Sequence, residues 1–258
     1  MERNLKTLLT HWPAGTIKSG NTLFQSGHYS RQAFHQYCRA GWVVRLGQGI
    51  YAKMGDIVGW EGALEGLETQ LGLPIKLGGL SALQLHGLGQ YVAFDESLYL
   101  YNTGTEKHAL PAWFSRLIKN TRYIQLHLFQ HNGIGFVSHD IGKITIHISS
   151  PERALLEMLA LVPDKMSFQH AFEIVENARL LEPNLMQKML ENCLSIKVKR
   201  LFLYMADSNQ LPCFRYLNAN NINLGRGERV IGQGGTFNSK YLISVPKILS
   251  DEPGSDGV

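Results

Sequence analysis

The sequence predicts an α+β protein, in which an N-terminal winged helix-turn-helix domain precedes a larger mixed α/β domain. The predicted elements of residues 1–56 are helix, helix, turn, helix and hairpin, which is the order of a winged helix. Helix and strand patterns then follow one another in mixed order to about residue 249. Because 258 residues exceed the usual domain size of roughly 100 to 200, we expect two domains, at 1–56 and 57–249.

Composition predicts a folded cytoplasmic protein. Hydrophobic residues make up 44% of the chain and charged residues 18%, a balance that argues against intrinsic disorder. The longest apolar run, residues 201–206, is far shorter than the roughly 20 residues of a membrane helix, and the N-terminus has no apolar signal core. The cysteines Cys38, Cys193 and Cys213 are odd in number and widely spaced, which predicts neither a disulfide framework nor a metal knuckle.

Three short helices are predicted in the N-terminal domain. The first ends at Pro13 and has an apolar stripe formed by Leu5, Leu8, Leu9 and Trp12. Asn21 is predicted to cap the second helix, which runs through Phe24. Ser30 is predicted to cap the third, from Arg31 to about residue 40.

The third helix has two different faces. Its apolar side is formed by Ala33, Phe34, Tyr37 and Cys38. Its polar side carries hydrogen-bond donors and is formed by Arg31, Gln32, His35, Gln36 and Arg39. Two strands are predicted to follow, at 42–46 and 50–53, joined across Gly47, Gln48 and Gly49 as the wing.

Charge supports DNA binding by this domain. Residues 1–56 hold seven Lys/Arg against two Asp/Glu, whereas the remainder holds 18 against 19. A local charge of +5 on such a fold favours a polyanionic partner. The simpler interpretation is a small winged fold that mediates protein contacts, with a polar helix face that is merely solvated.

The predicted DNA contacts divide into two kinds. Arg31, Gln32, Gln36 and Arg39 have side chains suited to base edges, whereas His35 suits either bases or phosphates. Arg45, Gln48 and Lys53 of the hairpin, and Lys18 and Asn21 ahead of the second helix, are better placed to contact the DNA backbone. The complete candidate set is Lys18, Asn21, Ser30, Arg31, Gln32, His35, Gln36, Arg39, Arg45, Gln48 and Lys53.

The larger domain is predicted from alternation and capping signals. A hinge at 56–59 precedes a helix from residue 60 to about 71. Strands are expected at 74–77, 97–101, 123–129, 134–137, 143–148, 222–224, 229–231 and 241–245. Helices are expected at 81–86, where Ser81 is the cap, and from Pro151 onward, where Ser150 is the cap. Further helices are expected at 168–180, 183–194 and 198–208. Residues 250–258 are expected to form a loose tail.

Several segments resemble one known family. They are residues 15–27, 30–31, 80–88 and 234–246, together with two longer motifs. The first of these motifs is Arg39-Ala40-Gly41-Trp42-Val43-Val44-Arg45-Leu46-Gly47-Gln48-Gly49-Ile50-Tyr51. The second is Ser150-Pro151-Glu152-Arg153-Ala154-Leu155-Leu156-Glu157. In this order they are similar to AbiEi antitoxins, which are transcriptional regulators of type IV toxin-antitoxin systems.

The resemblance implies a DNA-binding autorepressor. Its partners would be the double-stranded DNA of its own promoter and a nucleotidyltransferase toxin, which the C-terminal region opposes in function if not by direct contact. The resemblance implies no cofactor. An alternative keeps the winged-helix regulator but gives the C-terminal domain a ligand-sensing or dimerising role, with no toxin.

The sequence contains no motif that indicates an enzyme or a metal site. His127 and His131 are four apart in a strand pattern, where that spacing does not place two ligands on one face. The glycines at 225–227 and 232–235 lack phosphate-loop spacing, and no GxSxG motif occurs. Asp140 and Lys143 share one turn, unlike a nuclease core, which disfavours a DNA-tethered enzyme. We therefore expect no catalytic residues.

A second basic cluster, Lys197, Lys199 and Arg200, is expected on a solvated helix face. Together with Arg215, Arg226 and Arg229 it is kept as a secondary candidate for contacts with a partner.

Overall fold

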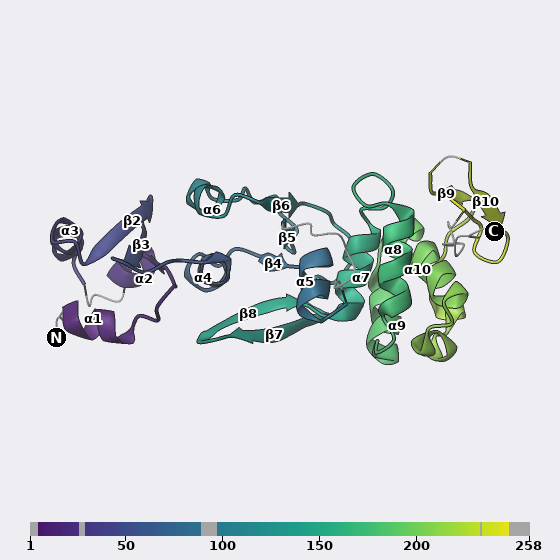
Figure 1. The fold of residues 1–258 in the computed structure, drawn as a ribbon, viewed down its shortest axis with the longest axis horizontal. Coiled ribbons are helices and arrows are strands. Elements are labelled where there is room, and N and C mark those ends of the chain that lie inside the picture. Colours follow the sequence, from purple (N-terminus) through teal and green to yellow (C-terminus); the bar gives the residue numbers. More distant parts are fainter. Residues whose placement is uncertain (1–4, 26–28, 89–96, 233, 248–258) are drawn as a thin grey trace, which may run out of the picture. The chain divides into compact units, whose positions relative to one another are not determined.

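The computed structural model describes residues 5–25, 29–88, 97–232 and 234–247. It contains both helices and strands, which confirms the α+β class (Figure 1). The chain folds into two compact units, each built from separated segments. The first unit contains Met1–Gly78, Glu96–Leu126 and Phe136–Ser149, and the second contains Gly79–Asp95, His127–Gly135 and Ser150–Val258.

The first unit begins with a winged-helix arrangement, coloured purple to blue in Figure 1. Its helices are α1 (Leu5–His11), α2 (Gly20–Gln25) and α3 (Arg31–Arg39). Its strands are β1 (Lys18–Ser19), β2 (Val43–Gly47) and β3 (Ile50–Lys53). They form an antiparallel sheet in the order β1-β3-β2. The predicted helix order and wing are therefore confirmed.

A small aromatic core holds these elements together. Its buried residues are Leu8, Trp12, Leu23, Phe34 and Val43. The ring of Phe34 lies edge-on to its neighbours, with centroid distances of 4.9 Å to Tyr51 and 5.6 Å to Phe24. Burial of one such side chain contributes about 1.5–3 kcal/mol. Phe34 therefore anchors α3 to both α2 and the wing.

The start of α2 differs from the prediction. Ser19, rather than Asn21, caps this helix, because the Oγ of Ser19 accepts a hydrogen bond from the backbone N–H of Thr22 at 3.1 Å. Asn21 lies inside the helix, and its side chain is exposed. The strand β1 was not predicted, because a two-residue strand is too short for an alternation pattern and forms only by pairing with β3.

A five-stranded sheet forms the rest of the first unit. Its strands are β4 (Ile75–Leu77), β5 (Leu98–Asn102), β6 (Thr121–Ile124), β7 (Phe136–Ile141) and β8 (Ile144–Ser149), in the order β6-β5-β4-β8-β7. The helical elements are α4 (Trp60–Glu65), continued by the π-helical turn η1 (Gly66–Gln70), and α6 (Ala112–Leu117). The strands predicted at 134–137 and 143–148 form an antiparallel hairpin, but β7 runs from Phe136 to Ile141 and the turn falls at residues 142–143.

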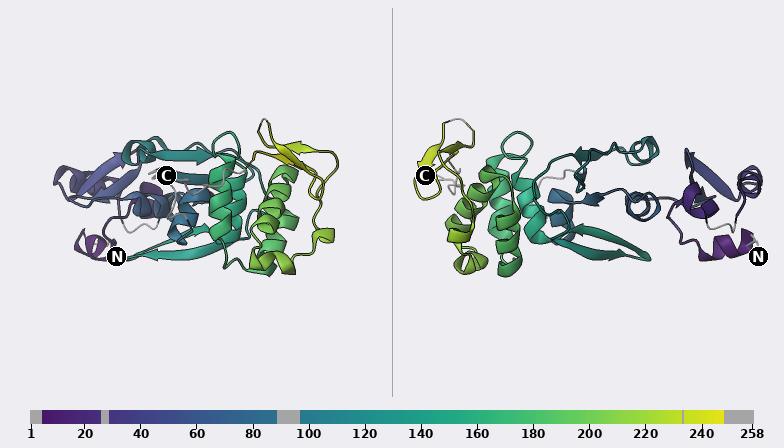
Figure 2. Two further views of the ribbon diagram at one scale, coloured as in Figure 1. Left: turned by 45° about the vertical axis from the view of Figure 1, so that its right-hand side comes forward. Right: turned by 180° about the vertical axis from the view of Figure 1, so that it is seen from behind.

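The second unit is mainly helical. Its helices are α5 (Gly79–Leu85), α7 (Pro151–Leu159), α8 (Phe168–Asn177), α9 (Pro183–Asn192) and α10 (Ile196–Ser208), with 3-10 turns η2 (Pro212–Tyr216) and η3 (Ala219–Asn221). A small sheet follows, formed by β9 (Arg229–Val230), β10 (Thr236–Asn238) and β11 (Ile243–Val245) in the order β10-β11-β9. Helix α7 is buried along most of its length and packs against α5, α8, α9 and α10 (Figure 2).

Several boundaries after residue 56 were predicted wrongly. Ser81 lies inside α5, which begins at Gly79, and so does not cap it. The strand expected at 222–224 is absent from the described residues, where η3 ends just before the buried Ile222. The strand expected at 123–129 ends at Ile124. Helix α6 and strand β10 were not predicted, and the tail at 250–258 lies outside the described residues.

The second basic cluster is not a solvated face. Lys199 and Arg200 are 3% and 1% exposed. The guanidinium of Arg200 donates to the backbone carbonyls of Leu224 and Leu242, both at 2.8 Å, and also to those of Gly225 and Gly227. Lys197 donates to the carbonyls of Ala160 and Val162. Lys197 and Arg200 therefore fix loops within the second unit, and the buried Lys199 and Arg200 are not available to a partner.

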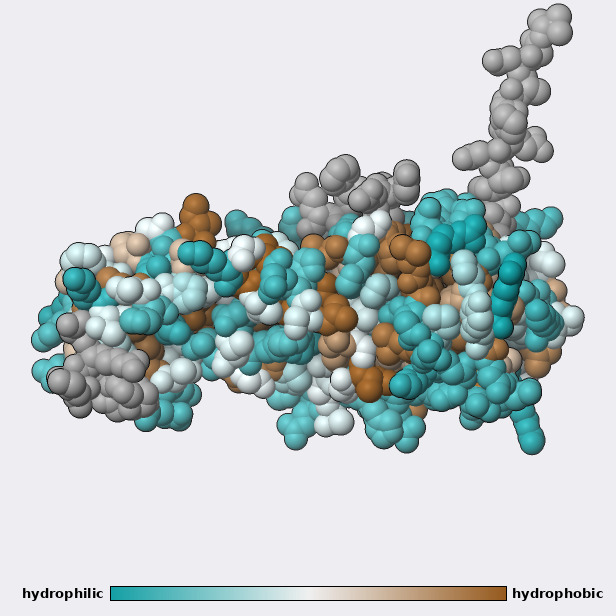
Figure 3. All heavy atoms as spheres, turned by 90° about the horizontal axis from the view of Figure 1, so that it is seen from below, coloured by the Kyte–Doolittle hydropathy of each residue, from teal (hydrophilic) through white to brown (hydrophobic). Residues whose placement is uncertain are grey.

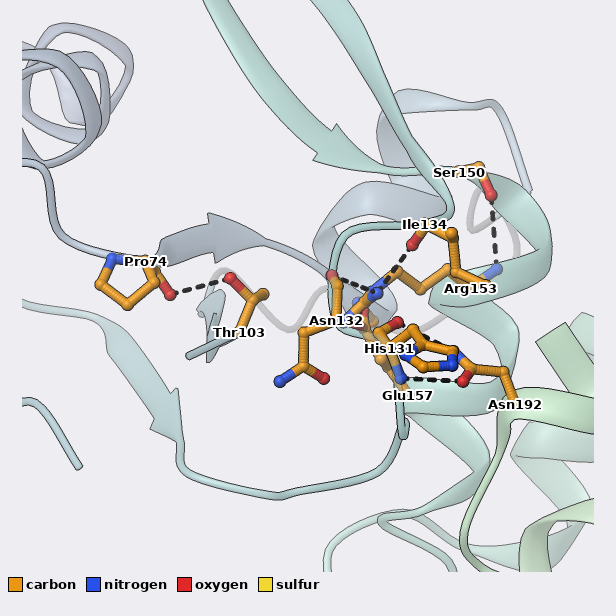
Figure 4. A network of polar contacts seen from close by, with 10 residues as sticks. Pro74, Thr103, His131, Asn132, Ile134, Ser150, Arg153, Glu157 and Asn192 are labelled. Carbon is orange, nitrogen blue, oxygen red and sulfur yellow. Dashed lines mark hydrogen bonds and ion pairs between the residues drawn. The ribbon is translucent and has the colours of Figure 1, made fainter. Parts of the chain in front are cut away.

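The Ser150–Glu157 motif forms a buried polar network at the start of α7 (Figure 4). Ser150 caps α7, as predicted, by accepting a hydrogen bond from the N–H of Arg153. The Nε of Arg153 donates to Oε1 of Glu157 at 2.7 Å, and its Nη1 donates to the carbonyls of Asn132 and Ile134 at 3.2 and 2.8 Å. One buried ion pair thus holds the 132–134 loop on the helix.

Glu157 also bonds the start of α5. Its Oε2 accepts a hydrogen bond from the N–H of Gly79 at 3.0 Å. The Arg153 guanidinium lies 4.4 Å from the ring centroid of Phe129, which adds a cation-π contact. Both side chains of the pair are almost fully buried, at 3% and 2% exposed. Loss of one partner would remove the ion pair from a charge that stays buried.

We therefore expect Glu157→Gln to lower the free energy of unfolding by about 3 kcal/mol or more. Urea denaturation followed by circular dichroism measures it. Lys240→Gln is the matched control, because Lys240 pairs with Asp207 at 2.7 Å while its side chain is 61% exposed. That variant should lose at most about 1 kcal/mol. Equal stabilities of the two variants would contradict this account of the network.

Candidate nucleic-acid interface

Helix α3 presents a polar face to solvent. Ser30 caps it, as predicted, by accepting a hydrogen bond from the N–H of Ala33 at 3.1 Å. Phe34 is buried, whereas the polar side chains on the other side of the helix are exposed. The exposed residues are Arg31, Gln32, His35, Gln36 and Arg39. The two-faced helix predicted from the sequence is therefore present.

A polar cavity of about 510 Å³ lies between α2, α3 and the wing. The predicted site residues that line it are Asn21, Arg31, Arg45 and Gln48. Its remaining lining residues are Ser19, Gly20, Phe24, Gly49, Ile50, Tyr51 and Leu71. No carboxylate lines this cavity among the described residues. Four side chains from three separate elements thus converge on one concave surface.

Backbone contacts fix the shape of the cavity. The N–H of Gly20 donates to the carbonyl of Gly49 at 2.7 Å and so ties the start of α2 to the wing. Gly49 has a φ of +66°, which a residue with a side chain rarely adopts. The Arg31 guanidinium lies 5.9 Å from the ring centroid of Phe24, and the Nε of Arg45 donates to the carbonyl of Gly47 at 3.0 Å. The two arginines are thus positioned before any ligand binds.

Two predicted residues lie outside this arrangement. Lys18 is half-buried in β1, opposite Tyr51 of β3, and does not line the cavity. The Nζ of Lys53 lies 3.5 Å from the carboxylate of Asp56. Because Asp56 offsets part of its charge, Lys53 is a weaker candidate for an anion contact than Arg45.

The thiol on the apolar side of α3 does not oppose this positive charge. Burial raises the pKa of Cys38, and the nearby Arg45 lowers it to a smaller extent. A thiol with a raised pKa is neutral near pH 7. The positive charge of Arg45 is therefore not offset by a thiolate.

Sequence reasoning missed the helix that supports the wing. A Cβ placed on Gly47 would lie 2.7 Å from the Cβ of Trp113 in α6, so the backbone of the wing packs directly on this side chain. The Nη2 of Arg116, also in α6, donates to the carbonyl of Leu46 at 3.1 Å. Pro111 and the aromatic pair that follows it were the available signal for this helix, but six helical residues are too few for a clear stripe.

Other classes of site find little support. Within the described part of the chain, no group of three or more His, Cys, Asp or Glu is arranged to hold a metal. His127 and His131 are both exposed and lie outside the named strands. Burial raises the pKa of Cys193 and of Cys213 to about 11, so neither carries a reactive thiolate near pH 7.

Hydrophilic and hydrophobic residues are interspersed on the face shown in Figure 3. No helix among the described residues is both long enough and apolar enough to cross a bilayer.

Comparison with known proteins identifies the family. Residues 1–94 match the family model described as the N-terminal domain of the AbiEi antitoxin transcriptional regulator. Residues 95–246 match the model described as the AbiEi antitoxin transcriptional regulator of type IV toxin-antitoxin systems. The chain belongs to the AbiEi antitoxin family. The predicted resemblance is thereby confirmed.

A solved structure shares the AbiEi fold seen here. It is the crystal structure of the RV2827C protein from Mycobacterium tuberculosis, with a TM-score of 0.61 over 92% of this chain and 88% of that one. Sequence identity is 14%, so this likeness concerns the fold alone. Curated protein sequences gave no match. The AbiEi models meet after residue 94, inside the second compact unit, and the predicted boundary at 56 remains a prediction.

The close approach of the wing to α6 can be tested. We expect Gly47→Ala to lower stability by about 1–3 kcal/mol, because the new methyl group collides with the Trp113 side chain. Thermal unfolding measures the change. Gly133→Ala is the matched control, since a Cβ there would meet nothing within 4 Å, and it should stay within about 0.5 kcal/mol of the native protein. A harmless Gly47→Ala would show that the wing does not depend on α6.

Proposed function

We propose that this AbiEi-family chain binds double-stranded DNA upstream of its own gene and represses transcription there. The observation that carries this proposal is the convergence of Asn21, Arg31, Arg45 and Gln48 on one cavity, beside the exposed donor face of α3. A concave surface with two guanidinium groups and no lining carboxylate favours a polyanion.

Helix α3 is the element that would enter the major groove. Its exposed Gln36 and Arg39 lie away from the cavity, so their donors are available to base edges. Arg suits the paired acceptors of guanine, and Gln suits the edge of adenine. Gln32 and His35 share the exposed face and would add contacts to bases or to nearby phosphates. Ser30 caps the helix by accepting a hydrogen bond from the N–H of Ala33, and its exposed O–H would still donate to a phosphate.

The cavity and the wing would bind the DNA backbone. Arg31 stands at the first turn of α3 and lines the cavity, with its guanidinium 5.9 Å from the ring centroid of Phe24, which favours a phosphate contact rather than base reading. Arg45, Gln48 and Asn21 border the same cavity from the other two elements. Contacts of this kind fix the register of the protein on the duplex and carry no sequence information. Lys18 and Lys53 would add only long-range attraction.

Repression would follow from occupancy of the promoter, with no cofactor. Because its proposed target is DNA, we place the protein in the cytoplasm. The family also implies an antitoxin role, so we propose a nucleotidyltransferase toxin, encoded next to this gene, as the functional partner. Residues outside α3 would neutralise that toxin.

Base reading by α3 is tested with Gln36→Ala/Arg39→Ala. We expect this double variant to lose about 1–3 kcal/mol per base contact on DNA from upstream of the gene, with little change on an unrelated duplex, because these side chains discriminate bases. Arg45→Ala should instead weaken both DNAs alike. Fluorescence anisotropy with the two duplexes measures both effects. Binding of the upstream DNA by the double variant at the native affinity would refute the assignment of α3.

The antitoxin role is tested by co-expression with the neighbouring gene. We expect the native chain to rescue growth when that gene product is toxic. Gln36→Ala/Arg39→Ala, with both genes under promoters foreign to them, should rescue equally well, since neutralisation would not require the reading helix. Failure of both chains to rescue would end the toxin proposal and leave repression standing. An adjacent gene that is not toxic would favour a regulator without a toxin.

A further inference from the structure

Two arginines from distant parts of the sequence meet at the wing. The Nε of Arg45, in β2, donates to the carbonyl of Gly47 at 3.0 Å. The Nη2 of Arg116, in α6, donates to the carbonyl of Leu46 at 3.1 Å. These two carbonyls are consecutive along the chain. Both guanidinium groups therefore bond to the last two residues of β2, although 71 positions separate the two arginines in the sequence.

Neither positive charge is neutralised nearby. Among the described residues, the ion pairs involve neither Arg45 nor Arg116. Both residues are exposed. A guanidinium has five N–H donors, and the hydrogen bonds to the wing carbonyls use one of them in each residue. Each arginine thus keeps donors and charge for a ligand.

The segment around Arg116 is also basic. Residues 112–125 contain Arg116, Lys119 and Arg122 and no Asp or Glu. Lys119 is exposed like Arg116. Because this stretch lies beside Arg45, it extends the positively charged surface beyond residues 1–56.

Helix α6 packs directly against the backbone of the wing. Trp113 is 6% exposed and packs on the backbone of Gly47, where even a methyl group would collide. Its ring lies edge-on to that of Phe114, which is buried, at a centroid distance of 5.7 Å. The Arg116 guanidinium therefore has a fixed place relative to the wing.

We propose that Arg116 binds a phosphate of the DNA backbone beside Arg45, so that the DNA-binding surface includes α6 as well as the winged helix. This inference rests on the proposed binding of DNA. The chemistry is that of guanidinium and phosphodiester, which form charge-assisted, often bidentate hydrogen bonds. The contact adds affinity for any duplex and does not read sequence.

The test separates a phosphate contact from support of the wing. In the full chain, Arg116→Gln removes the charge but retains an N–H donor for the Leu46 carbonyl, whereas Arg116→Lys retains the charge. Affinities for the upstream duplex and for an unrelated duplex are measured by fluorescence anisotropy over a series of salt concentrations. Arg179→Gln is the matched control, because Arg179 is exposed and also donates to backbone carbonyls, those of Asn209 and Gln210.

We expect Arg116→Gln to weaken both duplexes by the same factor, on the order of tenfold at low salt. The slope of log affinity against log salt should fall in magnitude by about 0.9, which corresponds to one lost phosphate contact. Arg116→Lys should restore most of that slope, and Arg179→Gln should match the native chain.

Other outcomes would overturn the inference in distinguishable ways. A native salt slope in Arg116→Gln, or a loss that Arg116→Lys does not restore, would reduce Arg116 to a structural support of the wing. In either case DNA binding stands if Gln36→Ala/Arg39→Ala still loses specificity. Absence of DNA binding by the native chain would overturn the proposed function itself.

A second measurement needs no variant. Phenylglyoxal modifies exposed arginines, and mass spectrometry locates the modified residues. DNA should protect Arg116 in the native chain but leave Arg179 reactive. Equal reactivity of Arg116 with and without bound duplex would also reject the contact.

Discussion

The packing of Phe34 is the constraint on which the candidate interface depends. Its buried ring contacts aromatic side chains of α2 and β3, and so fixes one face of α3 inward. The helical period then requires the residues between the anchors to point outward. Because those residues are polar and cationic, one apolar contact positions a whole set of hydrogen-bond donors. In the second unit, the buried Arg153–Glu157 pair has a comparable role for α5, α7 and the 132–134 loop.

Electrostatics distinguishes the two basic regions more clearly than composition does. Arg200 looks like a surface cation in the sequence, yet its donors are used by four backbone carbonyls in a buried site. Arg45 and Arg116 each donate to one carbonyl, remain exposed, and form no ion pair with the described residues. The same residue type therefore fastens loops in one unit and leaves unbalanced charge at the wing in the other. The number and position of the acceptors around each arginine decide which of these two roles it has.

Local signals predicted the elements that local physics controls. Ser30 and Ser150 cap their helices because a hydroxyl before a helix finds an orphan N–H without help from the rest of the fold. Elements that depend on distant partners were missed. Strand β1 exists through its pairing with β3, and α6 is held by contact of Trp113 with a wing glycine far away in the sequence. Arg116 was missed as a site residue for the same reason.

The contact between Gly47 and Trp113 also bears on how members of this family can diverge. A wing grafted from another homologue would need a glycine at the crossing point, or a smaller residue in place of the tryptophan. Modular exchange of the first 56 residues alone would therefore separate two surfaces shaped to each other. Chimaeras that carry residues 112–117 together with the grafted wing would preserve the contact between Gly47 and Trp113 while the exposed residues of α3 are exchanged.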